Sequence, residues 1–136
     1  MPTILVVDDN SAVVDALRLL FKQEKWRTVG LHDPKTIVET ATRETVDLVI
    51  LDMNFSRDTT SGGEGIEALA RLRAALPDLP VVLFTAWGTI ERAVEAIRLG
   101  AVDYLQKPWD NDRLLRLCRA QLEVRAARAE NRRASL

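Results

Sequence analysis

Acidic residues follow directly after two apolar runs of this sequence. Asp8 and Asp9 come after "ILVV", and Asp52 comes after "LVIL". Carboxylates that lie close together raise one another's pKa and do not all stay ionised unaided. A hard divalent cation removes this repulsion, and Mg²⁺ binds through a few carboxylates, several waters and a phosphate oxygen. Provided the fold brings the three carboxylates together, they indicate a magnesium site that is open to a phosphate group.

A hydroxyl and an ammonium group follow two further apolar runs. Thr85 ends the segment "VVLFT", and Lys107-Pro108 comes after "VDYLQ". The carboxyl ends of parallel strands meet at one edge of an open sheet, and ligands bind there where the strand order reverses. A lysine opposite the metal neutralises an anionic group that arrives between them. We therefore expect the hydroxyl and the ammonium to share one crevice with the three carboxylates.

Five short apolar runs supply the strands that such a crevice needs. They are Ile4–Val7, Thr28–Leu31, Leu48–Leu51, Val81–Phe84 and Val102–Leu105. Most lack polar alternation, which is typical of parallel strands covered on both faces. The segments between them carry apolar residues at helical spacing, and Asp33-Pro34 predicts the start of a short helix near residues 35–44.

This alternation of strand and helix predicts the fold class. It favours an α/β domain with a doubly wound, flavodoxin-like (CheY-like) five-stranded parallel sheet, strand order 2-1-3-4-5, and five helices. The length of 136 residues fits one domain. A single cysteine and the lack of a long apolar run point to the cytoplasm and away from a membrane span.

Four motifs carry a resemblance to a known family. They are "VVDDN", "VILDMN", "VVLFTAWG" and "DYLQKPW", in this order. Together they resemble the motif set of the receiver domain of two-component response regulators, and the likeness covers roughly residues 3–122. It implies a regulatory domain that is not an enzyme, since it catalyses only its own phosphorylation and dephosphorylation.

The resemblance implies a role for each acidic residue. Asp52 corresponds to the phosphoacceptor, which also binds the metal, and Asp9 to the direct ligand of Mg²⁺ or Mn²⁺. Asp8 corresponds to the acid that holds the metal through water, and Asn54 would offer its backbone carbonyl to the metal.

The resemblance also implies a switch. Thr85 corresponds to the hydroxyl that closes on the phosphoryl group, and Lys107 to the lysine that pairs with it. Tyr104 stands where the family has an aromatic residue whose rotamer follows phosphorylation, and Pro108 would follow a cis peptide bond. A sensor histidine kinase would donate the phosphoryl group, and the surface of the fourth helix, fifth strand and fifth helix would signal the change.

The end of the sequence suggests what the receiver serves. The segment from Thr85 to Leu114 resembles receivers of the nitrogen-regulatory (NtrC-like) type, which precede a sigma-54-dependent ATPase and a DNA-binding module. We expect residues 1–122 to form the receiver and residues 123–136 to extend its last helix as a linker to an output domain. Leu117, Val124 and Asn131 recur at seven, a weak heptad pattern that is compatible with a homodimer. We expect this domain itself to bind neither nucleic acid nor membrane.

Three other interpretations remain open. One is a stand-alone relay or adaptor receiver. Another is a small magnesium-dependent aspartyl-phosphate phosphohydrolase, although its second acid is replaced by Asn54. The third is a flavin or nucleotide carrier, although "DDNSAV" places acids where a phosphate-cradling loop is needed. One departure from the family also stands out: Ser56 replaces a common proline, and the loop from Asn54 to Gly65 is unusually long, with a role that the sequence does not assign.

Overall fold

The computed structural model describes residues 1–53, 63–85 and 90–134. Within these ranges strands and helices alternate along the chain. The elements are β1 (Thr3–Val7), α1 (Ser11–Gln23), β2 (Arg27–Leu31), a 3₁₀ turn η1 (Pro34–Thr36), α2 (Ile37–Arg43), β3 (Leu48–Asp52), α3 (Gly63–Ala75), β4 (Val81–Thr85), α4 (Ile90–Arg98), β5 (Asp103–Gln106) and α5 (Asn111–Ala134).

The five strands of the described ranges form one parallel sheet in the order β2-β1-β3-β4-β5. The predicted fold class and strand order are therefore confirmed. The fifth strand begins one residue later than its apolar run, at Asp103. Val102 is 40% exposed and lies in the turn that follows Gly100, whose φ of +112° is a conformation that glycine tolerates.

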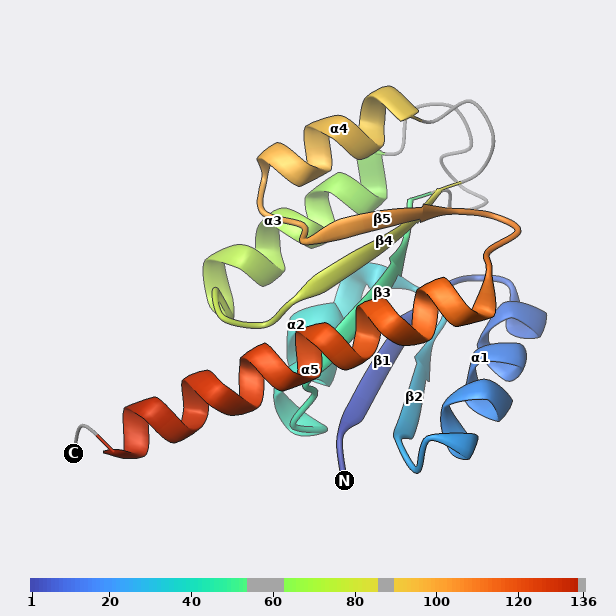
Figure 1. Ribbon diagram of the computed structural model, residues 1–136. Coiled ribbons are helices and arrows are strands. Elements are labelled where there is room, and N and C mark those ends of the chain that lie inside the picture. Colours follow the sequence, from blue (N-terminus) through green and yellow to red (C-terminus); the bar gives the residue numbers. More distant parts are fainter. Residues whose placement is uncertain (54–62, 86–89, 135–136) are drawn as a thin grey trace.

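Helices cover both faces of the sheet, with α1 and α5 on one face and α2, α3 and α4 on the other (Figure 1). Alternate residues of each central strand point to opposite faces. In β1, Leu5 and Val7 pack toward α2 and α3, whereas Ile4 and Val6 pack toward α1 and α5. Because both faces are covered, the strands need apolar side chains throughout, which explains the continuous apolar runs.

Helix α1 follows the paired acids without a long loop. Its N-cap is Asn10, whose side chain accepts a hydrogen bond from the Ala12 N–H at 3.0 Å. The helix buries Val14, Leu17 and Phe21 against the sheet. This local cap fixes the turn between β1 and α1, where Asp8 and Asp9 lie.

Helix α5 continues well beyond the sheet contacts of its first half. It has 24 residues, and its buried anchors Leu114 and Cys118 lie near its start. Figure 1 shows its last turns extending past the sheet. Among the described helices, none has both the length and the apolar character that crossing a bilayer requires.

Candidate functional site

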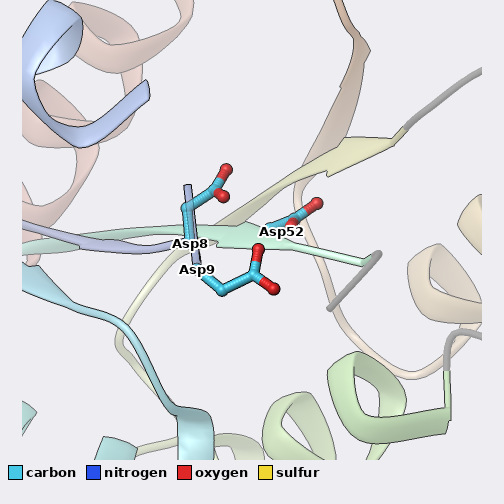
Figure 2. A group of neighbouring side chains, drawn as sticks. All are labelled: Asp8, Asp9 and Asp52. Carbon is cyan, nitrogen blue, oxygen red and sulfur yellow. The ribbon is translucent and has the colours of Figure 1, made fainter. Parts of the chain in front are cut away.

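Asp8, Asp9 and Asp52 meet at the carboxyl end of the sheet. Strands β1 and β3 are neighbours in register, with Val7 opposite Leu51, so the residues that follow them emerge side by side. One carboxylate oxygen from each acid lies within 4.8 Å of the others. Figure 2 shows the three side chains extending to the same side of this edge. Asp8 and Asp52 are only 1% and 2% exposed, whereas Asp9 is open to solvent.

Lys107 brings the compensating positive charge to these acids. Its Nζ lies 2.8 Å from Asp8 Oδ2 and 3.4 Å from Asp52 Oδ1. Burial by itself lowers the pKa of Lys107, but the hydrogen bond to Asp8 and the charge of Asp52 outweigh it, so this pKa is raised above its usual value. The side chain is therefore a firmly charged ammonium at neutral pH.

The backbone fixes the position of this lysine. The Lys107 N–H donates to the Thr85 carbonyl at 2.8 Å, so the end of β5 is tied to the end of β4. The peptide bond between Lys107 and Pro108 is cis. The ammonium thus reaches across two strand ends to Asp8 and Asp52 from a fixed point on the edge.

Asp8 is held on several sides. Its Oδ1 accepts the Asn10 N–H at 2.9 Å, and its Oδ2 accepts from Lys107. Its backbone N–H donates to the Leu31 carbonyl at 3.0 Å, and the Nδ1 of His32 lies 3.3 Å from its carbonyl oxygen. His32 was not among the site residues that the sequence predicted. The signal was its place after β2, a neighbour of β1, because strand ends next to one another share an edge.

Thr85 carries a buried hydroxyl at the end of β4. The residue is 0% exposed, and its Oγ1 has no hydrogen-bond partner within the described part of the chain. A buried polar group without a partner costs about 1–3 kcal/mol. A hydroxyl in this state favours any change that brings a hydrogen-bond acceptor to it.

Tyr104 and Asn54 complete the residues that the sequence singled out. Tyr104 is half-buried in β5 and packs against the apolar cluster beneath α2, α3 and α4. It lies three residues before Lys107. Asn54 lies outside the described residues, so its predicted contact with the metal remains a prediction.

The charges of the cluster match a divalent cation. When ionised, three carboxylates beside one ammonium leave an excess of two negative charges in a partly buried space. All three donors are carboxylate oxygens, the hard ligands that Mg²⁺ prefers. The residues present therefore fit a bound divalent cation, and the exposed Asp9 leaves a side of the cluster accessible to an incoming group.

Comparison with known proteins agrees with the resemblance that the four sequence motifs carry. A family model described as the response regulator receiver domain matches residues 4–119. The chain is 35% identical over 122 residues to the alginate biosynthesis transcriptional regulatory protein AlgB of Pseudomonas putida. This match covers 90% of the chain and 26% of AlgB, so the chain spans about a quarter of that relative's length.

Two solved structures extend the likeness to three dimensions. The receiver domain of NtrX from Brucella abortus matches with a TM-score of 0.79 and 32% identity, over 88% of this chain and 98% of that one. The N-terminal signal receiver domain of a two-component response regulator from Bacteroides fragilis matches with a TM-score of 0.78 and 38% identity, over 90% and 97%. With the family model and the acid–lysine edge, they confirm the resemblance that the four motifs carried. This chain belongs to the receiver domain family of two-component response regulators.

Proposed function

We propose that Asp52 is the residue of this receiver domain that accepts a phosphoryl group from a sensor histidine kinase. The observation that carries the proposal is the position of its carboxylate, buried at 2% exposure with Lys107 Nζ 3.4 Å away and two further acids within 4.8 Å. Asp8 is a poorer nucleophile, because each of its two oxygens already accepts a strong hydrogen bond. Asp9 is exposed, whereas the Asp52 carboxylate is buried beside the Lys107 ammonium.

The transfer itself moves one phosphoryl group between two nucleophiles. An oxygen of Asp52 attacks phosphorus in line, the bond from phosphorus to the imidazole nitrogen breaks, and the imidazole leaves with the bonding electron pair. The Lys107 ammonium, already fixed at this edge, stabilises the charge on the phosphoryl oxygens. A magnesium or manganese ion held by Asp9 and Asp52, by Asp8 through water and by the Asn54 carbonyl would supply further positive charge there.

The acyl phosphate then acts on Thr85 and Tyr104. The Thr85 hydroxyl has no partner among the described residues, so a phosphoryl oxygen gives it one and draws it toward Asp52. Tyr104 moves into the space that is vacated and alters the surface formed by α4, β5 and α5. That surface already exposes Val94 and Ile97 by 44% and 38%. Phosphorylation thereby shifts the population between two conformations of this surface.

The partners follow from this role and from the relatives. We propose that the receiver comprises residues 1–122 and that residues 123–136 lead to an output domain. AlgB is named a transcriptional regulatory protein, and we propose a transcriptional output for this chain as well. The exposed Val124 and Ala127 on α5 are available for a homodimer contact. We place the protein in the cytoplasm, where sensor kinases present their phosphohistidine.

Phosphorylation with a small donor tests the proposal directly. The chain is incubated with Mg²⁺ and radiolabelled acetyl phosphate, and the label is located by mass spectrometry. We expect one alkali-labile group on Asp52, no label in Asp52→Asn, and full labelling in the matched control Asp47→Asn, which changes an aspartate at the other end of β3. Label retained in Asp52→Asn would place the acceptor elsewhere, and turnover of many equivalents of donor would indicate a phosphohydrolase.

A further inference from the structure

Helix α5 is attached to the domain by two different kinds of contact. In its first half Leu114 and Cys118 are fully buried, and Leu117 and Leu122 pack partly buried against the same apolar cluster. In residues 123–133 none of the side chains is buried. The second half therefore has no apolar anchor, and another interaction must hold it where it lies.

Two arginines of the second half contact the rest of the domain. Arg125 donates from Nη1 to the Asp78 carbonyl at 3.1 Å and from Nη2 to the Val46 carbonyl at 3.5 Å, and its Nε lies 3.5 Å from Asp47 Oδ1. Arg132 follows two helical turns later, and its Nη1 lies 2.9 Å from Asp78 Oδ2. The spacing of seven residues puts both guanidinium groups on the same face of the helix.

These arginines reach across open space. A cavity of about 330 Å³ lies between α5 and the ends of α2 and α3, and one of about 400 Å³ lies between α5 and the N-terminal residues. Both cavities are lined by Arg125 and Arg132. The long arginine side chains therefore lie along two grooves between the helix and the rest of the domain.

The anchors on the domain side precede two neighbouring strands, β3 and β4. Asp47 immediately precedes β3, and Asp78 lies just before β4. Asp47 is itself fixed, because its N–H donates to the Thr3 carbonyl at 2.8 Å and its Oδ2 accepts the Thr3 N–H at 2.9 Å. The arginines thus hold the amino-terminal ends of the same strands whose carboxyl ends carry Asp52 and Thr85.

Solvent access makes this attachment weak and sensitive to salt. The side chains of Arg125 and Asp47 are 30% and 34% exposed, and those of Arg132 and Asp78 are 61% and 57% exposed. Ion pairs of this kind contribute about 0–1 kcal/mol each and are screened by salt. The free energies of the attached and the detached second half of α5 are therefore similar.

We propose that residues 123–134 form an electrostatic strap, which docks on the amino-terminal edge of the sheet through Arg125 and Arg132 and is released when these pairs are screened or lost. In the docked state the domain sets the direction of the helix that leads out of it. In the released state the helix pivots near Leu122, where the buried contacts end.

The distance between the strap and the domain tests this proposal. Spin labels are attached to the exposed sites Glu39→Cys on α2 and Ala127→Cys on α5, and electron–electron double resonance measures their separation. We expect a narrow distance distribution at about 50 mM salt that broadens severalfold at about 500 mM salt. The double variant Arg125→Gln/Arg132→Gln should show the broad distribution at low salt already.

A matched pair of arginines controls for net charge. Arg128 and Arg133 lie on the same segment, are exposed and make no hydrogen bond or ion pair with any residue that the structure describes. Arg128→Gln/Arg133→Gln should therefore keep the narrow distribution, and the exchanged pair Arg132→Asp/Asp78→Arg should regain what Arg132→Asp loses. A narrow distribution in Arg125→Gln/Arg132→Gln, or equal broadening in both double variants, would overturn the proposal.

Discussion

Pairs of carboxylates and cations lie at both ends of the sheet, buried at the carboxyl end and exposed at the amino end. At the carboxyl end, Asp8 and Asp52 are almost completely buried and share one ammonium, whose side chain is 25% exposed. At the amino end, Asp78 pairs with Arg132 while more than half of each side chain is in solvent. Both are contacts between carboxylates and cations, but only the first lies where water cannot substitute for a missing partner.

This difference decides what each end can do. Buried charges interact strongly and are costly when a partner is removed, so the carboxyl end depends on the balance of its cations. Exposed charges gain little from pairing, because water solvates each of them nearly as well. The first arrangement suits a site that binds metal and phosphate, and the second suits a contact that opens and closes readily.

Removal of Lys107 tests the buried end and has the largest expected effect. Lys107→Ala leaves the carboxylates of Asp8 and Asp52 without their ammonium, which should lower the free energy of unfolding by about 3–5 kcal/mol in a metal chelator. Millimolar Mg²⁺ should restore part of this loss by neutralising the same acids. Urea unfolding with and without Mg²⁺ measures both effects. A variant as stable as the wild type in chelator would contradict the comparison.

The thiol of Cys118 lies in the buried first half of α5, so its reactivity reports on that half and not on the strap. Burial raises the pKa of this thiol to about 12. At pH 8 the folded chain should therefore react with iodoacetamide about a thousandfold more slowly than the urea-unfolded chain, whose thiol has an ordinary pKa. Since only the thiolate reacts, the folded rate should rise about tenfold per pH unit toward pH 12. Salt should leave this rate unchanged even where it releases the strap, and a salt-dependent rate would mean that both halves move together.

Substitution of Thr85 separates stability from switching. Thr85→Val removes a buried hydroxyl that has no partner among the described residues, so the free energy of unfolding should stay equal or rise by up to about 1 kcal/mol. The conformational change that follows phosphorylation, measured by spin-label distances or by fluorescence, should be lost. Thr28→Val is the matched control, because the Thr28 hydroxyl on β2 is also buried and without a described partner. Loss of the phosphorylation response in Thr28→Val would show that the effect is not specific to the site.

The exposed end should give the smallest change. Arg125→Gln is expected to lower the free energy of unfolding by about 0.5–1 kcal/mol at low salt and by almost nothing at high salt. Thermal unfolding monitored by circular dichroism at both salt concentrations measures this difference. An effect that persists at high salt would mean that Arg125 acts through packing and not through its charge.

The sequence predicted the carboxyl end well for a physical reason. Continuous apolar runs and the polar residues that follow them are local patterns, and parallel topology brings all such strand ends to one edge. Asp8, Asp9, Asp52 and Lys107 were therefore expected together, and the structure places them together. Their roles in metal binding and phosphoryl transfer remain predictions, and the contact of Asn54 lies outside the described residues.

The amino end could not be predicted in the same way. The pairs of Arg125 with Asp47 and of Arg132 with Asp78 join residues 78 and 54 positions apart, and no local period connects them. The heptad pattern through Val124 suggested a homodimer contact and did not indicate these pairs. The start of β5 was also misjudged at Val102, because this apolar residue is exposed although Ala101 before it is buried.

Strand β3 links both ends, and its length constrains how this chain can change. All five of its residues are buried, and the charges at Asp47 and Asp52 lie about 16 Å apart along it. Side chains alternate between faces, so one inserted residue would turn Asp52 toward the wrong layer while leaving Asp47 in place. Insertions and deletions should therefore be excluded from this strand in descendants of the sequence, although single apolar exchanges inside it are tolerated.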